Sequence, residues 1–274
     1  MNQQTVYTLG KKWGKPIKSL LNRMGYGIHR LEINAYGVQQ LLLSRVQVGT
    51  IFDVGANKGA MIDEYRSRFP SAMVYGFEPL REEYLNLLLR KYKNDDLVFP
   101  VPFAVSDKEG RDRFYINQER ASSSLLPTVE NASYYFDIPD IFKGTDTTKV
   151  QTVTLDGFCE REVIKKIDIL KMDIQGAELP ALRGARNMLE SSSILLIYSE
   201  TMFLNLYEGQ PAYYKICEFL DQYDYRLFNW YNLYHSKSNE LVTGDAIFIS
   251  PKLREILQGM KDMRPFCVET RKRV

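Results

Sequence analysis

The chain has 274 residues, of which 45% are hydrophobic and 26% are charged, proportions that are ordinary for a soluble globular protein. Its 36 basic and 34 acidic side chains leave a net charge of +2, which gives no reason to expect a nucleic-acid partner. No run approaches the roughly 18 apolar residues of a transmembrane helix, and the three cysteines have no metal-ligand spacing. We therefore expect a cytoplasmic protein without a metal site or a membrane span.

Residues 1–48 precede the first predicted strand, and we expect them to form a helical extension of a domain at residues 49–274. Basic and apolar side chains alternate at helical spacing over residues 11–24, which would give an amphipathic helix with weak affinity for a membrane surface. Pro16 interrupts this helix, so docking on its own domain or on a partner subunit of a homo-oligomer is the favoured interpretation. A second helix is predicted over residues 38–48.

Residues 50–59 read as a buried strand, a glycine turn and the start of a helix. Gly55 lets the chain turn sharply, and Gly59 lets the helix start lie close to a ligand. The charge of Asp53, just before the turn, would repel the pyrophosphate of a dinucleotide but attract a cationic ligand. Glu78 closes the next apolar run roughly 20 residues past the glycines, where a ribose-binding acid belongs. These residues predict a site for S-adenosylmethionine, which carries a sulfonium and an ammonium group.

Strands and helices are predicted to alternate along the remaining chain. Helices are expected at residues 59–69, 80–92, 155–165 and 212–223 and in the segment that contains Pro180. Strands are expected at residues 73–78, 97–105, 113–116, 150–154, 167–173, 194–200, 225–230 and 246–249. This order predicts a Rossmann-like, doubly wound α/β domain with a mostly parallel sheet and an antiparallel last strand.

Two stretches depart from this alternation. Pro100 and Pro102 lie within the strand predicted at residues 97–105 and place it at an edge of the sheet or at a bulge. Residues 117–149 have no clear periodicity, and long loops of this kind are usually lids or binding loops. We therefore expect the second stretch to become ordered over the site when ligand binds.

Four of the predicted core strands end in an acidic residue, namely Asp53, Glu78, Asp173 and Glu200. In a doubly wound sheet the ligand lies beyond the carboxyl ends of the strands. Any one of these acids alone could be a solvated turn residue. Their recurrence favours a crevice that binds a cation and several hydroxyl groups.

Five segments, taken in order, carry a more specific signal. They are Asp53-Val54-Gly55-Ala56-Asn57-Lys58-Gly59, Phe77-Glu78-Pro79, residues 104–110, residues 170–178 and residues 206–210. Together they resemble the FkbM family of S-adenosylmethionine-dependent methyltransferases. The resemblance implies a class I methyltransferase fold and methylation of a hydroxyl group on a sugar, a glycan or a natural product.

The resemblance also implies which residues bind the cofactor. The methionine end of S-adenosylmethionine would lie against Asp53, Gly55, Ala56, Asn57 and Gly59. The ribose would lie against Glu78, followed by Pro79, and the adenine would border Val105, Ser106 and Asp107. Gln175 departs from the family, because many members carry Glu there, and no catalytic base is assigned to that position.

Transfer of a methyl group to an alcohol depends mainly on positioning, and a general base adds about 10² to 10⁴ in rate. Asp173 is the first candidate for this base, although it could instead hold the ammonium group of the cofactor or orient the acceptor. Glu178, Glu200 and His235 are the next candidates. Glu178 could equally be a favourable partner for the dipole of a helix start.

Aromatic side chains are frequent in the C-terminal third of the chain. Such rings can stack on a sugar, and we expect the acceptor to be a small molecule or a glycan. One or two of Tyr207, Trp230 and Tyr231 are expected to contact it.

Two other functions stay open at this point. A non-catalytic Rossmann-like scaffold that binds a nucleotide or a glycan is kept open by Gln175. A nicotinamide-dependent dehydrogenase is disfavoured by Asp53 and by Asn57, which stands where the dinucleotide motif has its second glycine.

Overall fold

The structure is a computed structural model that describes residues 34–137 and 140–258. The amphipathic helix predicted over residues 11–24 lies outside these ranges. The chain divides into two compact units, residues 1–38 and 39–274, of which the second holds the sheet. The predicted domain boundary stays a prediction, because most of the first unit lies outside the described residues.

A seven-stranded sheet forms the centre of the second unit, with the strand order β3-β2-β1-β7-β8-β10-β9. Its strands are β1 (Thr50–Val54), β2 (Met73–Phe77), β3 (Val98–Val101), β7 (Ile167–Met172), β8 (Ile194–Met202), β9 (Arg226–His235) and β10 (Leu241–Ile249). All neighbours from β3 to β8 run parallel, and β10 runs antiparallel to both β8 and β9. The predicted Rossmann-like sheet is confirmed, and β10 is its antiparallel last strand.

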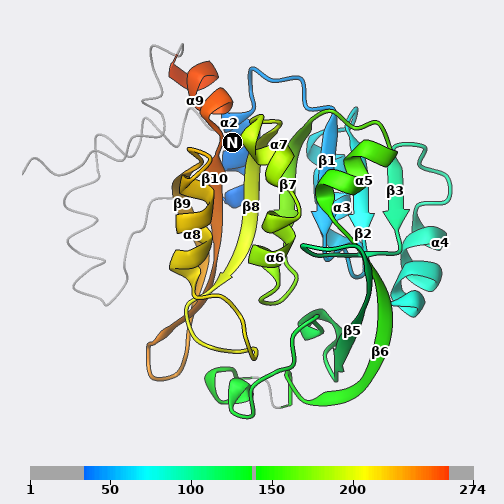
Figure 1. Cartoon of the computed structure of the whole chain (residues 1–274), viewed down its shortest axis with the longest axis vertical. Coiled ribbons are helices and arrows are strands. Elements are labelled where there is room, and N and C mark those ends of the chain that lie inside the picture. The colour runs from blue at the N-terminus through cyan, green and yellow to red at the C-terminus, as the bar shows by residue number, and fades with distance from the viewer. Residues whose placement is uncertain (1–33, 138–139, 259–274) are drawn as a thin grey trace, which may run out of the picture. The chain divides into compact units, whose positions relative to one another are not determined.

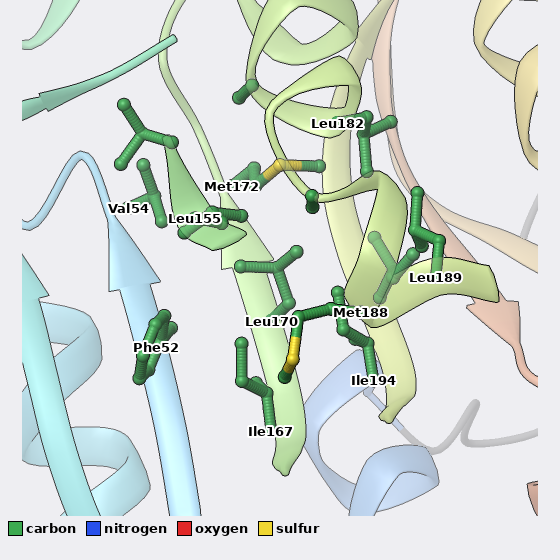
Figure 2. Packing of buried hydrophobic residues seen from close by; sticks show 14 of the residues in the cluster. Phe52, Val54, Leu155, Ile167, Leu170, Met172, Leu182, Met188, Leu189 and Ile194 are labelled. Carbon is green, nitrogen blue, oxygen red and sulfur yellow. The ribbon is translucent and has the colours of Figure 1, made fainter. Parts of the chain in front are cut away.

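Helices cover both faces of this sheet. They are α3 (Ala60–Arg68), α4 (Leu89–Lys91), α5 (Leu155–Arg161), α6 (Glu178–Arg183), α7 (Arg186–Glu190), α8 (Tyr213–Asp221) and α9 (Pro251–Gln258). Helices α5 to α8 lie on one face (Figure 1), and their apolar side chains pack on strand residues such as Phe52 and Leu170 (Figure 2). On the opposite face α3 packs closely on β2, because a Cβ at Gly76 would lie 2.6 Å from Ile62 Cδ1.

A second sheet, of three strands in the order β4-β6-β5, lies beyond the carboxyl ends of β1 to β3 (Figure 1). Its strands are β4 (Ala104–Val105), β5 (Gly110–Asn117) and β6 (Gly144–Val153), and the 3-10 helices η2 (Arg120–Ser122) and η3 (Ala132–Tyr135) lie between β5 and β6 in the sequence. A small apolar core joins this sheet to Leu80 and contains Ala104, Phe114, Ile116 and Val150. The second sheet therefore packs where the ligand of a doubly wound sheet would lie.

Two strand predictions were wrong. The strand predicted over residues 97–105 is two strands in different sheets, because Pro102 lacks an N–H group and separates β3 from β4. As predicted from its prolines, β3 lies at the edge of the large sheet. Residues 117–149 are not irregular throughout, since β6 begins at Gly144. The first residues of β6 are polar and exposed, so the sequence shows no apolar alternation there.

Helix bounds also differ from the predicted ones. Residues 80–92 form a π-helix, η1 (Glu83–Leu88), followed by α4, and α5 ends at Arg161. The segment with Pro180 breaks into α6 and α7 at Gly184, where a Cβ would lie 2.2 Å from the Ser106 carbonyl oxygen. Helix α2 (Ala35–Leu42) ends before the predicted residue 48, and α9 was not predicted. Within residues 34–137 and 140–258, none of the helices has the length and apolar content needed to cross a bilayer.

The central core can be tested with Leu170→Ala. Leu170 is fully buried on β7, and the truncation leaves a cavity under α5 to α8, so we expect the free energy of unfolding to fall by about 2–5 kcal/mol. The matched control is Leu227→Ala on β9, where Leu227 is 40% exposed, and there the change should stay below about 0.5 kcal/mol. Urea denaturation of both variants measures the difference, and equal losses would contradict this core.

Candidate active site

The turn after β1 depends on its first glycine. Gly55 has a left-handed backbone with φ of +84°, and a Cβ there would lie 2.0 Å from the Asp173 carbonyl oxygen. The N–H groups of Gly55 and Ala56 donate to the Phe77 carbonyl oxygen at 3.1 and 2.9 Å. The turn is therefore held between β2 and β7, and only glycine lets it lie against Asp173.

A cavity of about 320 Å³ lies beside this turn at the carboxyl ends of β1, β2 and β7. The predicted site residues that line it are Gly55, Ala56, Asn57, Glu78, Pro79, Val105 and Asp173. The predicted site residues that do not line it are Asp53, Gly59, Ser106, Asp107, Glu178, Glu200 and His235. Phe103, Phe114 and Leu125 form an apolar wall of the cavity, and no sequence motif pointed to them.

Glu78 joins the end of β2 to the glycine turn. Its Oε2 accepts the Asn57 N–H at 2.9 Å, and its Oε1 accepts the Leu80 N–H at 2.8 Å. Burial raises the pKa of Glu78 to about 7, although these two hydrogen bonds oppose the shift. Both carboxylate oxygens keep a further lone pair for a ligand on the cavity side.

Asn57 supplies a buried acceptor beside the cavity. Its backbone is left-handed, with φ of +44°, and it follows the glycine turn. Its side-chain Oδ1 is buried and has no hydrogen-bond partner. A buried acceptor without a donor costs about 1–3 kcal/mol, so a ligand that donates a hydrogen bond there would be stabilised.

Asp53 is paired with a lysine that the sequence analysis did not consider. Asp53 is fully buried, and its Oδ1 lies 2.9 Å from Lys171 Nζ, on the neighbouring strand β7. Burial raises the pKa of Asp53, and the Lys171 charge opposes the shift. Lys171 Nζ also donates to the Gly55 carbonyl oxygen at 3.3 Å and lies 3.9 Å from Asp173 Oδ2. Asp53 therefore neutralises Lys171 beneath the turn and is not brought into the cavity.

Gln175 connects two of the predicted acids. Its Nε2 donates to Asp173 Oδ1 at 2.8 Å and to Glu200 Oε2 at 2.6 Å. The Asp173 and Glu200 carboxyl groups are also within hydrogen-bonding reach of each other, and burial together with the Asp173 charge raises the pKa of Glu200 well above its usual range. Sequence reasoning noted Gln175 only as a departure from a family pattern, because its partners lie on different strands.

Two contacts hold Gln175 in place. Its backbone is left-handed, with φ of +58°, and its carbonyl oxygen accepts the Ser124 hydroxyl at 2.8 Å. The Tyr207 hydroxyl lies 2.7 Å from Gln175 Oε1 and 2.7 Å from the Ser122 carbonyl oxygen. Tyr207 is fully buried, and the expected contact of one or two of Tyr207, Trp230 and Tyr231 with an acceptor stays a prediction.

Residues 120–125 close one side of the cavity. Arg120, Ala121, Ser123 and Leu125 line it. Ser124 and Tyr115 exchange two backbone hydrogen bonds of 2.8 and 3.1 Å, which fasten this segment to β5. The segment is thus a wall of the cavity, and its predicted ordering upon ligand binding stays a prediction.

The remaining candidate bases lie elsewhere. Glu178 is buried at the start of α6, and its Oε1 accepts the N–H groups of Ile174 and Gly176 at 3.1 and 3.3 Å. Burial raises the pKa of Glu178 to about 7. His235 is exposed at the end of β9, where it pairs with Leu241. Of the candidates, the structure places Asp173 at the cavity and Glu200 directly behind it.

A sequence model of the methyltransferase FkbM domain matches residues 53–227, which contain the glycine turn, Glu78 and Asp173. The chain belongs to the FkbM methyltransferase family. This confirms the family resemblance that the motifs carry. The FkbM methyltransferase described here is 27% identical to the 2-O-methyltransferase NoeI of Sinorhizobium fredii, over 64% of this chain and 72% of NoeI.

Two further similarities are more distant. The chain is 23% identical to the hexuronic acid methyltransferase AglP of Haloferax volcanii, over 58% of this chain and 59% of AglP. Among solved structures it is similar to Aeropyrum pernix fibrillarin in complex with natively bound S-adenosyl-L-methionine, with 13% identity and a TM-score of 0.40, over 78% of this chain and 76% of that chain.

The methyl donor of this FkbM methyltransferase is S-adenosylmethionine, and the residues of the cavity fit it. The buried Oδ1 of Asn57 would accept a hydrogen bond from its ammonium group. The Glu78 carboxylate would accept from the ribose hydroxyls. The apolar wall that includes Phe103 and Phe114 would cover the adenine.

Cofactor affinity should depend on the ionisation of Glu78. Because burial raises the pKa of Glu78 to about 7, the carboxylate gains a proton as the pH falls through that value and loses acceptor capacity. In calorimetric titrations we expect S-adenosylhomocysteine to bind several-fold more weakly at pH 6 than at pH 8. Glu78→Gln should bind weakly at both, whereas Glu82→Gln, at an exposed neighbour, should keep the original profile. A Glu78→Gln variant with normal affinity would remove Glu78 from the site.

Loss of Asp53 should destabilise the fold, because Lys171 would keep a buried charge without its counter-ion. We expect Asp53→Asn to lower the free energy of unfolding by about 3 kcal/mol. Adding Lys171→Met should recover much of this loss, since neither charge is then buried alone. A double-mutant cycle in urea measures the coupling, and strictly additive losses would contradict the pairing of Asp53 with Lys171.

Proposed function

We propose that this FkbM methyltransferase transfers the methyl group of S-adenosylmethionine to a hydroxyl oxygen of a sugar or glycan. The observation that carries the proposal is the Asp173 carboxylate, which lines the cofactor cavity and is held by Gln175. A carboxylate in this place can accept the proton that an alcohol loses as it is methylated. The printed names of the two relatives, a 2-O-methyltransferase and a hexuronic acid methyltransferase, support a sugar as the acceptor.

The contacts of Asp173 support its role as the base. When bound, the cofactor supplies an electrophilic methyl carbon, and the new carbon–oxygen bond forms as the carbon–sulfur bond breaks. Gln175 Nε2 fixes Asp173 Oδ1 at 2.8 Å, which leaves Oδ2 to accept the proton of the acceptor hydroxyl. Glu200 Oε2 accepts the same Gln175 amide at 2.6 Å, and burial together with the Asp173 charge raises the pKa of Glu200.

Gln175 supports the catalytic interpretation over the non-catalytic scaffold. The scaffold alternative depended on Gln175 replacing a catalytic acid. In the structure its amide donates to both Asp173 and Glu200, and its Oε1 lies 2.7 Å from the Tyr207 hydroxyl. A side chain that orients two acids at a cofactor cavity is consistent with proton transfer. Calorimetric titration with S-adenosylhomocysteine and with NAD distinguishes methyltransferase, scaffold and dehydrogenase.

Asp173→Asn tests the base directly. The variant keeps the size of the side chain but removes its charge and its capacity to take a proton. We expect turnover to fall by about 10²-fold or more while the affinity for S-adenosylhomocysteine changes little. Turnover is measured by transfer of label from S-adenosylmethionine to a glycan panel.

Asp96→Asn is the matched control, because Asp96 is an exposed acid that does not line the cavity, and it should keep full turnover. Near-normal turnover in Asp173→Asn would show that Asp173 is not the base. A fall in cofactor affinity that precedes any fall in turnover would instead assign Asp173 to the ammonium group of the cofactor.

A further inference from the structure

Beyond Asp173, hydrogen-bonding side chains continue across the sheet onto β8, β10 and β9. Glu200 on β8 is the register partner of Asp245 on β10, so their side chains lie on the same face. Asp245 Oδ2 accepts the Tyr198 hydroxyl at 2.6 Å and the Asn232 side-chain Nδ2 at 2.6 Å. We call Asp173, Glu200, Asp245, Tyr198 and Asn232 the polar row.

The polar row is one continuous electrostatic unit. Gln175 Nε2 donates to both Asp173 Oδ1 and Glu200 Oε2, and the register places Asp245 beside Glu200, so the three carboxyl groups follow one another across the sheet. Its inner end, Asp173, lines the cofactor cavity, and its outer end, Asn232, is exposed on β9. A ligand that reaches the cofactor from the side of β9 would therefore pass along hydrogen-bonding groups over its whole length.

The polar row has an excess of negative charge. Asp173, Glu200 and Asp245 lie on it, and Glu178 is near enough to raise the pKa of Glu200 further. Lys171 is the cation that lies 3.9 Å from Asp173, but its charge is already shared with Asp53. Another carboxylate in this place would meet like charges, whereas hydroxyl groups can donate to the carboxylates and to Asn232 Oδ1. The Asn232 Nδ2 already donates to Tyr198 and Asp245.

We infer that the polar row binds the acceptor and that the acceptor is an uncharged, polyhydroxylated sugar, with a uronic acid selected against. The inference rests on the proposed transfer of a methyl group to a sugar hydroxyl and adds the charge class of that sugar. Vicinal hydroxyl pairs match carboxylate and amide groups, which can each form two hydrogen bonds. The acidic side chains of the polar row would repel the carboxylate of a uronic acid. This repulsion discriminates against an anionic sugar without any further contact to the neutral one.

Two matched sugar pools test the charge selection. The first is a mixture of neutral hexose oligosaccharides, and the second is the same mixture after oxidation of its primary alcohols to carboxylates. With labelled S-adenosylmethionine at pH 7.5, we expect at least about tenfold more label in the neutral pool. Saturation-transfer NMR on the protein loaded with S-adenosylhomocysteine measures binding of both pools without turnover, and we expect signals from the neutral pool alone.

The two measurements separate this inference from the proposed function. Equal or preferred labelling or binding of the oxidised pool overturns the inference, and so does the absence of binding by either pool. Selective binding of the neutral pool without any transfer of label supports the charge class and overturns the proposed function instead.

Variants on the polar row test its place in acceptor binding. Asn232→Ala should raise KM for the neutral pool by about fivefold or more, with little change in kcat or in affinity for S-adenosylhomocysteine. Asn229→Ala, at an exposed asparagine of the same strand whose Oδ1 accepts the neighbouring Trp230 N–H, is the matched control and should change neither value.

Asp245→Asn should reduce the discrimination between the two pools several-fold, because it removes one negative charge while it keeps the side-chain size. A purely structural effect of this substitution would lower turnover of both pools equally. Unchanged KM in folded Asn232→Ala would overturn the inference. So would unchanged selectivity in Asp245→Asn. Because Asn232 is exposed, its variant keeps the inference testable even if Asp245→Asn does not fold.

Discussion

The ion pair between Asp53 and Lys171 is the interaction on which the site depends. It joins β1 to β7 in the middle of the sheet, where both side chains are almost fully removed from water. Two charges in such a place are stable only together, since removal of either leaves the other buried without a counter-ion. The lysine also donates to the Gly55 carbonyl oxygen, so the pair fixes the glycine turn that the cofactor approaches.

One wall of the cavity comes from the three-stranded sheet and from residues 120–125. The three-stranded sheet packs on Leu80 through its own small core, and residues 120–125 lie between that core and the turn after β7. Ser124 and Tyr207 hold Gln175 in a left-handed conformation that a non-glycine residue rarely adopts. Such strain persists only where surrounding contacts determine it, and here those contacts also orient Asp173 and Glu200.

Acidic groups are concentrated at one edge of a protein whose net charge is only +2. Burial raises the pKa of Glu78 and of Glu178 to about 7, and the pKa of Glu200 is raised further by its acidic neighbours. This crowding favours a cationic cofactor and disfavours an anionic acceptor. It also makes proton content near neutral pH a property of the whole cluster, because each group changes the ionisation of the next.

Strand β1, the glycine turn after it and the acid that follows β2, Glu78, could be predicted from the sequence alone. Neighbouring residues encode them, through the backbone freedom of glycine and the hydrophobic pattern of the strands. The sequence also determined the order of strands and helices, and hence the parallel sheet. Polar, exposed residues at the start of β6 carried no such pattern, so only the end of that strand, within residues 150–154, was predicted.

Only the tertiary structure decided which acids face a ligand. Asp53 and Asp173 look alike in the sequence, as acids at the ends of buried strands. The register of β1 and β7 gives Asp53 a lysine as its partner, while Asp173 lies one step beyond the strand, at the cavity. The bridge from Gln175 to Glu200 likewise depends on strands brought together by folding. Charge neutralisation is set by neighbours in space, and local sequence pattern does not encode it.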